Sequence, residues 1–149
     1  MPVISINGAP GVGKSFLVRQ IAAREGMPAF LEGEEGVLPE RIMKNVLSGG
    51  DPRERYEFFL QHYEKMWKTA QAVSNAGFTC YVDGAPISVK ATILAENKKE
   101  YTELLPNFNH LDKYTPNTTI LLTTTEQQLK EQMHRRGRTT EQERSAIKR

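Results

Sequence analysis

The segment 8–15 reads Gly-Ala-Pro-Gly-Val-Gly-Lys-Ser and separates two stretches with different hydrophobic patterns. The stretch before it, residues 2–7, is mostly apolar and predicts a short buried strand. The stretch that begins at its end, residues 13–24, has apolar residues at helical spacing, and Gly26 follows as a stop signal. A strand, a glycine-rich turn and a helix in this order are typical of α/β proteins with a parallel sheet.

The rest of the sequence continues this alternation. Apolar runs predict further strands over 29–31, 78–82 and 118–122. Helical patterns cover 38–47, 52–76, 86–99, 100–110 and 126–136. We therefore expect a three-layer α/β/α fold, in which helices cover both faces of a parallel sheet. The length of 149 residues is typical of one domain, so we expect residues 1–149 to form a single domain.

The order of residue types in segment 8–15 matches the pattern G-x-x-x-x-G-K-[ST] of a phosphate-binding loop, or P-loop. Glycines let backbone N–H groups turn inward around phosphates, and the following helix adds the positive end of its dipole. Lys14 is expected to reach the β- and γ-phosphates, and the Ser15 hydroxyl to bind Mg²⁺. We expect ATP and Mg²⁺ as cofactors and the following residues as their binding loop: Gly8, Ala9, Pro10, Gly11, Val12, Gly13, Lys14 and Ser15.

A cluster of cations follows near the end of the last predicted helix. It contains Arg135, Arg136 and Arg138 around the helix-breaking Gly137. Phosphoryl transfer benefits from movable cations, and arginines on a closing lid typically raise its rate by about 10³ to 10⁵. The pattern favours a kinase with an arginine-rich lid; the alternative is a solvated helix end whose arginines face the negative end of the helix dipole.

In order and spacing, these elements resemble the P-loop deoxyribonucleoside kinase family, within the nucleoside and nucleotide kinase superfamily. The resemblance covers nearly the whole chain: the phosphate loop, an acid after the second strand, a glutamine on the long helix, an aspartate after the third strand and an arginine lid. It implies transfer of the γ-phosphoryl group of ATP to the 5′-hydroxyl of a (deoxy)nucleoside. Lys14, Arg135, Arg136 and Arg138 would stabilise the transition state.

The resemblance also implies roles for residues outside the loop and the lid. Glu32 would be the general base near the acceptor hydroxyl, with two further glutamates of the same segment competing for that role. Gln61 would bind the acceptor base, and Glu141 the sugar 3′-hydroxyl. Asp83 would contact the acceptor hydroxyl and help to organise Mg²⁺. Each role has a structural alternative. The glutamates could be solvated loop acids, Gln61 an exposed helix residue and Asp83 a helix cap.

Two departures from the family pattern leave other functions open. Residues 84–86 are Gly, Ala and Pro, so the arginine expected after Asp83 is missing. The given sequence stops at Arg149, whereas members of the family continue into a fifth strand and a last helix. A truncated chain and a minimal variant of the family both fit this difference. Kinases of nucleoside monophosphates or other small molecules stay open, and Arg53, Arg55 and Lys65 could serve an extra phosphate. A nucleotide-binding regulatory protein without turnover is the alternative from another class.

Composition argues against several other classes of protein. The net charge is only +2, and Glu141 and Glu143 interrupt the basic tail, which disfavours a nucleic-acid partner. The single cysteine, Cys80, lies in an apolar run and is expected to be a buried thiol. The sequence contains no membrane-spanning run and no signal peptide, so we expect a cytoplasmic protein. A homodimer through the long helix and the helix after Pro86, as in the resembling family, stays open.

Overall fold

The computed structural model describes residues 1–9, 11–32, 39–48, 51–96 and 102–135. Within this part of the chain, four strands form one sheet in the order β2-β3-β1-β4. All pairings are parallel, so the carboxyl ends of the strands meet at one edge of the sheet. The strands are β1 (Val3–Gly8), β2 (Ala29–Phe30), β3 (Cys80–Asp83) and β4 (Thr118–Leu122).

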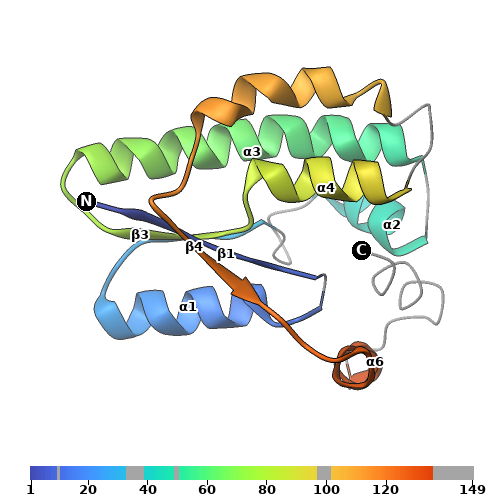
Figure 1. The fold of residues 1–149 in the computed structure, drawn as a ribbon, viewed down its shortest axis with the longest axis horizontal. Helices are drawn as coiled ribbons and strands as arrows, with labels where there is room; N and C mark the ends of the chain where they lie inside the picture. The colour runs from blue at the N-terminus through green and yellow to red at the C-terminus, as the bar shows by residue number, and fades with distance from the viewer. Residues whose placement is uncertain (10, 33–38, 49–50, 97–101, 136–149) are drawn as a thin grey trace.

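Helices cover both faces of the sheet, as predicted (Figure 1). Helix α1 (Lys14–Glu25) covers one face, where Val18 and Ala22 pack with Ile6 of β1. The long helix α3 (Pro52–Asn75) covers the other face together with α4 (Pro86–Glu96). Helix α2 (Glu40–Ser48) packs against α3, and α6 (Glu126–Arg135) follows β4.

The larger hydrophobic core lies between the sheet and α3. Trp67 and Tyr63 are fully buried there, and Phe108 packs into the same cluster from the 3-10 helix η1 (Leu105–Lys113). Tyr63, Met66 and Ala70 of α3 are also buried, so the apolar face of this helix packs into the core. Cys80 is also buried, with a free thiol, as expected.

The helix predicted over 100–110 differs from the observed structure. Residues 97–101 lie outside the described part, and the helix that follows is the 3-10 helix Leu105–Lys113. Pro106 accounts for the difference, because proline has no N–H to donate and is tolerated only in the first turn of a helix. In the structure it occupies that first turn.

Helix α3 begins as its sequence predicts. The Asp51 side chain accepts a hydrogen bond from the backbone N–H of Arg53 at 3.0 Å, and Pro52 occupies the first position. Among the described residues, no helix is both long and apolar enough to cross a membrane.

Candidate active site

The glycine-rich loop joins the carboxyl end of β1 to the start of α1. Gly13, at the N-cap of α1, has φ 101° and ψ 16°, a left-handed conformation that favours glycine. No described side chain caps this helix, so its first N–H groups face the loop without a side-chain acceptor. Such a helix start attracts anions, and phosphate groups fit it well. Pro10, which was predicted as part of the loop, lies outside the described residues.

The Lys14 side chain folds back over the same loop. Its Nζ atom donates hydrogen bonds to the carbonyl oxygens of Gly8 at 3.1 Å and Ala9 at 3.3 Å. These neutral acceptors hold the ammonium group beside the start of α1. A phosphate oxygen is a stronger acceptor for an ammonium group than a carbonyl oxygen, so a phosphate bound at the loop would compete for Lys14.

Asp83 ends β3, next to β1, and faces the first turn of α1. Its Oδ2 atom accepts a hydrogen bond from the Ser15 hydroxyl, and Oδ1 has no hydrogen-bond partner among the described residues. The side chain is only 1% exposed. Burial raises the pKa of Asp83, while the Ser15 hydrogen bond and the Lys14 charge act in the opposite direction.

Ser15 and Asp83 together fit a magnesium site. Mg²⁺ prefers oxygen ligands and is usually held by one or two carboxylates together with the phosphates of the nucleotide. A hydroxyl and a carboxylate with one unpartnered oxygen supply this donor set next to the phosphate-binding loop. No group of three or more potential His, Cys, Asp or Glu ligands occurs in the part of the chain that the structure describes. A site of this kind would therefore depend on the nucleotide for its other ligands.

Glu32 follows β2 and lies at the same edge of the sheet. Its carboxylate is close to the Tyr63 hydroxyl of α3 and to Gly84, which follows β3. Tyr63 is fully buried, and its pKa is held well above 10.0, first by burial and then by the negative charges of Glu32 and Asp83. The structure thus brings two predicted carboxylates, Glu32 and Asp83, together around one tyrosine.

Tyr63 belongs to this cluster, although the helical pattern over 52–76 did not single it out as a site residue. Such a pattern reports which face of a helix is buried and not which chemistry that face carries. The residue type itself could have indicated the site, because a buried tyrosine hydroxyl usually has a polar neighbour. Here that neighbour is the Glu32 carboxylate.

Gln61 lies on the exposed surface of α3, so the structure does not bring it into this buried cluster. Its neighbour His62 is half-buried and stacks on Phe58, with ring centroids 5.7 Å apart and planes at 12°. Burial lowers the pKa of His62 below 6.5, partly opposed by contacts with the backbone of Leu31 and Glu32. Sequence spacing missed this imidazole, which lies next to the acidic cluster.

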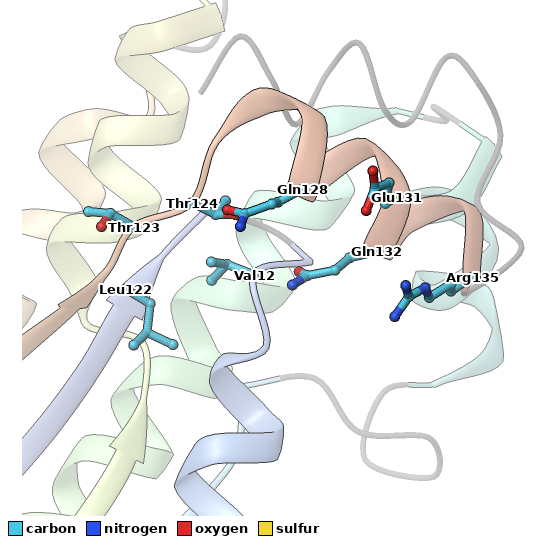
Figure 2. Close-up of a pocket in the computed structure, with 8 residues that line it drawn as sticks. All are labelled: Val12, Leu122, Thr123, Thr124, Gln128, Glu131, Gln132 and Arg135. Carbon is cyan, nitrogen blue, oxygen red and sulfur yellow. The ribbon is translucent and has the colours of Figure 1, made fainter.

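A second part of the site is an open hollow of about 310 Å³ between the loop and α6 (Figure 2). Figure 2 shows Gln132 and Arg135 projecting from α6 on the side of Val12. The Gln132 Oε1 atom is buried and has no hydrogen-bond partner among the described residues. The hollow is lined by Val12, Leu122, Thr123, Thr124, Gln128, Glu131, Gln132 and Arg135.

The predicted lid is therefore only partly described. Arg135, the last residue of α6, lines the hollow beside the loop. Arg136, Arg138 and Glu141, which were predicted as lid and sugar-binding residues, lie outside the described residues.

Several solved structures share this fold over most of the chain. Deoxyadenosine kinase from M. mycoides with bound dATP superposes with a TM-score of 0.71 at 19% identity, covering 98% of this chain and 79% of that one. Thymidylate kinase from Candida albicans gives 0.66 at 17% identity, covering 87% and 66%. A gluconokinase from Sinorhizobium meliloti 1021 gives 0.56 at 18% identity, covering 98% and 73%.

The chain has the fold of the P-loop kinases. At identities of 16–19% these likenesses describe the fold, and three different acceptors occur in the names of the matched proteins. No family model matches the sequence, and no curated protein does. What this chain does with that fold must therefore be inferred from its own residues.

Proposed function

We propose that the chain is a kinase that uses ATP and Mg²⁺ to phosphorylate a hydroxyl group of a small molecule. The 5′-hydroxyl of a (deoxy)nucleoside is the first candidate acceptor. The observation that carries the proposal is the convergence of Lys14, Asp83 and Glu32 at the edge of the sheet where the phosphate-binding loop lies. The deoxyadenosine kinase with the same fold supports a nucleoside as the acceptor.

The donor phosphates would bind at the loop. Backbone N–H groups at the start of α1 would bind their oxygens, and Lys14 would turn to them from its present carbonyl acceptors. Ser15 and Asp83 would hold Mg²⁺, which neutralises phosphate charge when it is bound. Arg135 and the two following lid arginines would neutralise the transferring group.

The acceptor hydroxyl would lie beside Glu32. Its oxygen forms a bond to the γ-phosphorus, while its proton passes to the Glu32 carboxylate. The bond from the γ-phosphorus to the bridging oxygen breaks, and ADP leaves with that electron pair. Glu32 suits the role of proton acceptor because its carboxylate lies at the carboxyl ends of the strands, where ligands of such sheets bind.

The hollow beside α6 would hold the base and ribose of ATP. It adjoins the loop through Val12, so a nucleotide whose phosphates lie on the loop can extend into it. The unpartnered Gln132 Oε1 could accept a hydrogen bond from the amino group of adenine. Gln128 and Glu131 add further polar groups to the same wall.

A nucleoside monophosphate is the second candidate acceptor. An extra phosphate on the acceptor requires cations near it, and arginine binds phosphate in a bidentate manner. Arg53 and Arg55 lie in the first turn of α3, and a thymidylate kinase shares the fold. The acceptor that is phosphorylated therefore distinguishes a nucleoside kinase from a nucleoside monophosphate kinase.

The test is an assay of ADP release from MgATP by the purified chain. The panel contains nucleosides, nucleoside monophosphates and unrelated hydroxyl compounds such as gluconate, together with a reaction without acceptor. We expect one nucleoside to raise ADP release above the acceptor-free rate. If no compound does so while MgATP still raises the melting temperature, the kinase proposal fails and a nucleotide-binding regulatory protein explains the data.

A matched pair of variants tests the general base. Glu32→Gln should lower kcat by about 10² to 10⁴ and leave the MgATP-induced rise in melting temperature unchanged, because the residue contacts the acceptor and not the donor. Glu57→Gln, on the exposed surface of α3, is the control and should behave like the original chain. Equal turnover in both variants would assign the base to another residue.

A further inference from the structure

We propose that Tyr63 is a positioning residue that holds the Glu32 carboxylate toward the acceptor, and that Gly84 makes room for this contact. The inference rests on the proposed function and deepens it. It also accounts for the missing arginine after Asp83, because the Tyr63 hydroxyl and the Glu32 carboxylate lie where a side chain at position 84 would begin.

The packing around Gly84 carries the first step. Gly84 has φ +84°, and a Cβ atom built there would lie 2.7 Å from the Tyr63 hydroxyl oxygen and 3.1 Å from Glu32 Oε2. The Gly84 N–H also donates to the Ile6 carbonyl at 2.9 Å, which fixes this backbone to β1. No larger residue fits unless the hydroxyl or the carboxylate moves. An arginine at this position would require a shift of the same two groups that form the cluster.

The chemistry of the hydroxyl carries the second step. The Tyr63 oxygen is buried and makes no hydrogen bond of standard geometry to any described residue, and the Glu32 carboxylate beside it is the acceptor within its reach. Burial and the surrounding negative charge keep the phenol protonated, and it remains a donor at neutral pH. A neutral donor can orient a carboxylate without adding a positive charge to it. Tyr63 is fully buried and would thus act on the acceptor only through Glu32.

The charged surroundings of the pair come from three elements. Asp83 faces it from the end of β3, and His62 lies next to Tyr63 on α3. The positive charges of Lys14 and Arg19 on α1 act on Asp83 and lower its pKa. The Tyr63 hydroxyl is a neutral donor that lies close to the Glu32 carboxylate.

The kinetic test compares Tyr63→Phe with Tyr56→Phe. Both tyrosines are buried on α3 in the same core cluster, two helical turns apart, and each change removes only a hydroxyl group. We expect Tyr63→Phe to lower kcat by about 10-fold to 100-fold without changing the KM for ATP. Tyr56→Phe should change neither kcat nor the KM for ATP. Equal effects of the two changes on kcat, or a loss in Tyr63→Phe that falls on the KM for ATP instead of kcat, would overturn the positioning role.

A double-mutant cycle tests the geometry without any activity. Gly84→Ala should lower the melting temperature, and adding Tyr63→Phe should restore part of the loss, because the hydroxyl that meets the new methyl group is gone. Strictly additive losses would show that the hydroxyl does not lie against position 84 and would refute the inference. If the original chain releases no acceptor-dependent ADP, the proposed function fails instead, even where the cycle shows coupling.

Discussion

Two strands flank β1, and they differ sharply in their surroundings. All four residues of β3, Cys80–Asp83, are buried between layers of helices. In β4, residues 118–121 are exposed, and Leu121 reaches 65% exposure. Both strands pair in parallel with the same central strand, so the difference comes from what covers them.

The comparison separates two kinds of site at one sheet edge. The buried strand ends at Asp83, where low solvent access strengthens electrostatic interactions and raises the pKa of the carboxyl group. The exposed strand leads to the open hollow beside α6, where polar side chains meet solvent. Chemistry that needs exclusion of water fits the first, and exchange of a nucleotide fits the second. The predictions below test this division.

The largest expected effect is at the loop between the two regions. Lys14→Ala should abolish the MgATP-induced rise in melting temperature and lower kcat by at least about 10² to 10³, because the phosphates lose their closest cation. Thermal unfolding with and without MgATP measures the first effect. Lys68→Ala, an exposed change on α3, is the control. A Lys14→Ala protein that MgATP still stabilises would contradict the assignment of the loop.

The buried region should show a conflict between activity and stability at Asp83. Asp83→Asn should lower kcat by about 10² or more, because one magnesium ligand is lost. The folded-state pKa of Asp83 is raised above 3.8, so ionisation destabilises the native state as pH rises through that value. Asparagine does not ionise, and the variant should melt at a higher temperature at pH 7, with the difference vanishing below about pH 3.8.

Melting curves of the ligand-free protein across pH test this conflict. Asp112→Asn, an exposed change on η1 where the aspartate pairs with Lys90, is the control and should show no such gain. A lower melting temperature for Asp83→Asn at pH 7 would mean that the Ser15 hydrogen bond and the Lys14 charge outweigh burial.

Much of the fold could be predicted because strands and helices leave local patterns. The apolar run 118–122 gave β4 with its observed bounds, and Asp51 with Pro52 gave the start of α3. The 3-10 helix was missed because its boundary depends on one proline. The strand order β2-β3-β1-β4 joins residues far apart in the chain, and no local pattern encodes it.

The candidate site was less accessible to prediction. Lys14, Ser15 and Asp83 could be found because each follows a strand, and parallel strands bring their carboxyl ends together. Spacing along the chain suggested Gln61, but each helical residue rotates by about 100°. Gln61 therefore lies on the far side of α3 from Tyr63, two positions later. The partnership of Tyr63, Glu32 and Gly84 is a packing relation among three elements, and it becomes visible only in the folded chain.

The difference in burial between β3 and β4 can be measured at matched positions on the two strands. Val82 of β3 and Thr119 of β4 both pair with Ser5, one on each side of β1. Val82→Ala should destabilise the fold by about 2 kcal/mol because the residue is fully buried, while Thr119→Ala should cost less than about 1 kcal/mol. Urea unfolding of the two variants measures the difference. Equal costs would show that β4 is covered in solution as completely as β3.

The smallest expected effect is at Leu121, a hydrophobic residue of β4 that is 65% exposed. Leu121→Thr should change the free energy of unfolding by no more than about 0.5 kcal/mol, because the leucine makes few contacts to lose and threonine suits a strand. Urea unfolding at two protein concentrations is the measurement. A loss above about 1 kcal/mol that grows with protein concentration would mean that the leucine is buried against another chain, since association stabilises by mass action. A flat result at both concentrations would leave β4 as a solvated edge, and the contrast with β3 would then hold in solution.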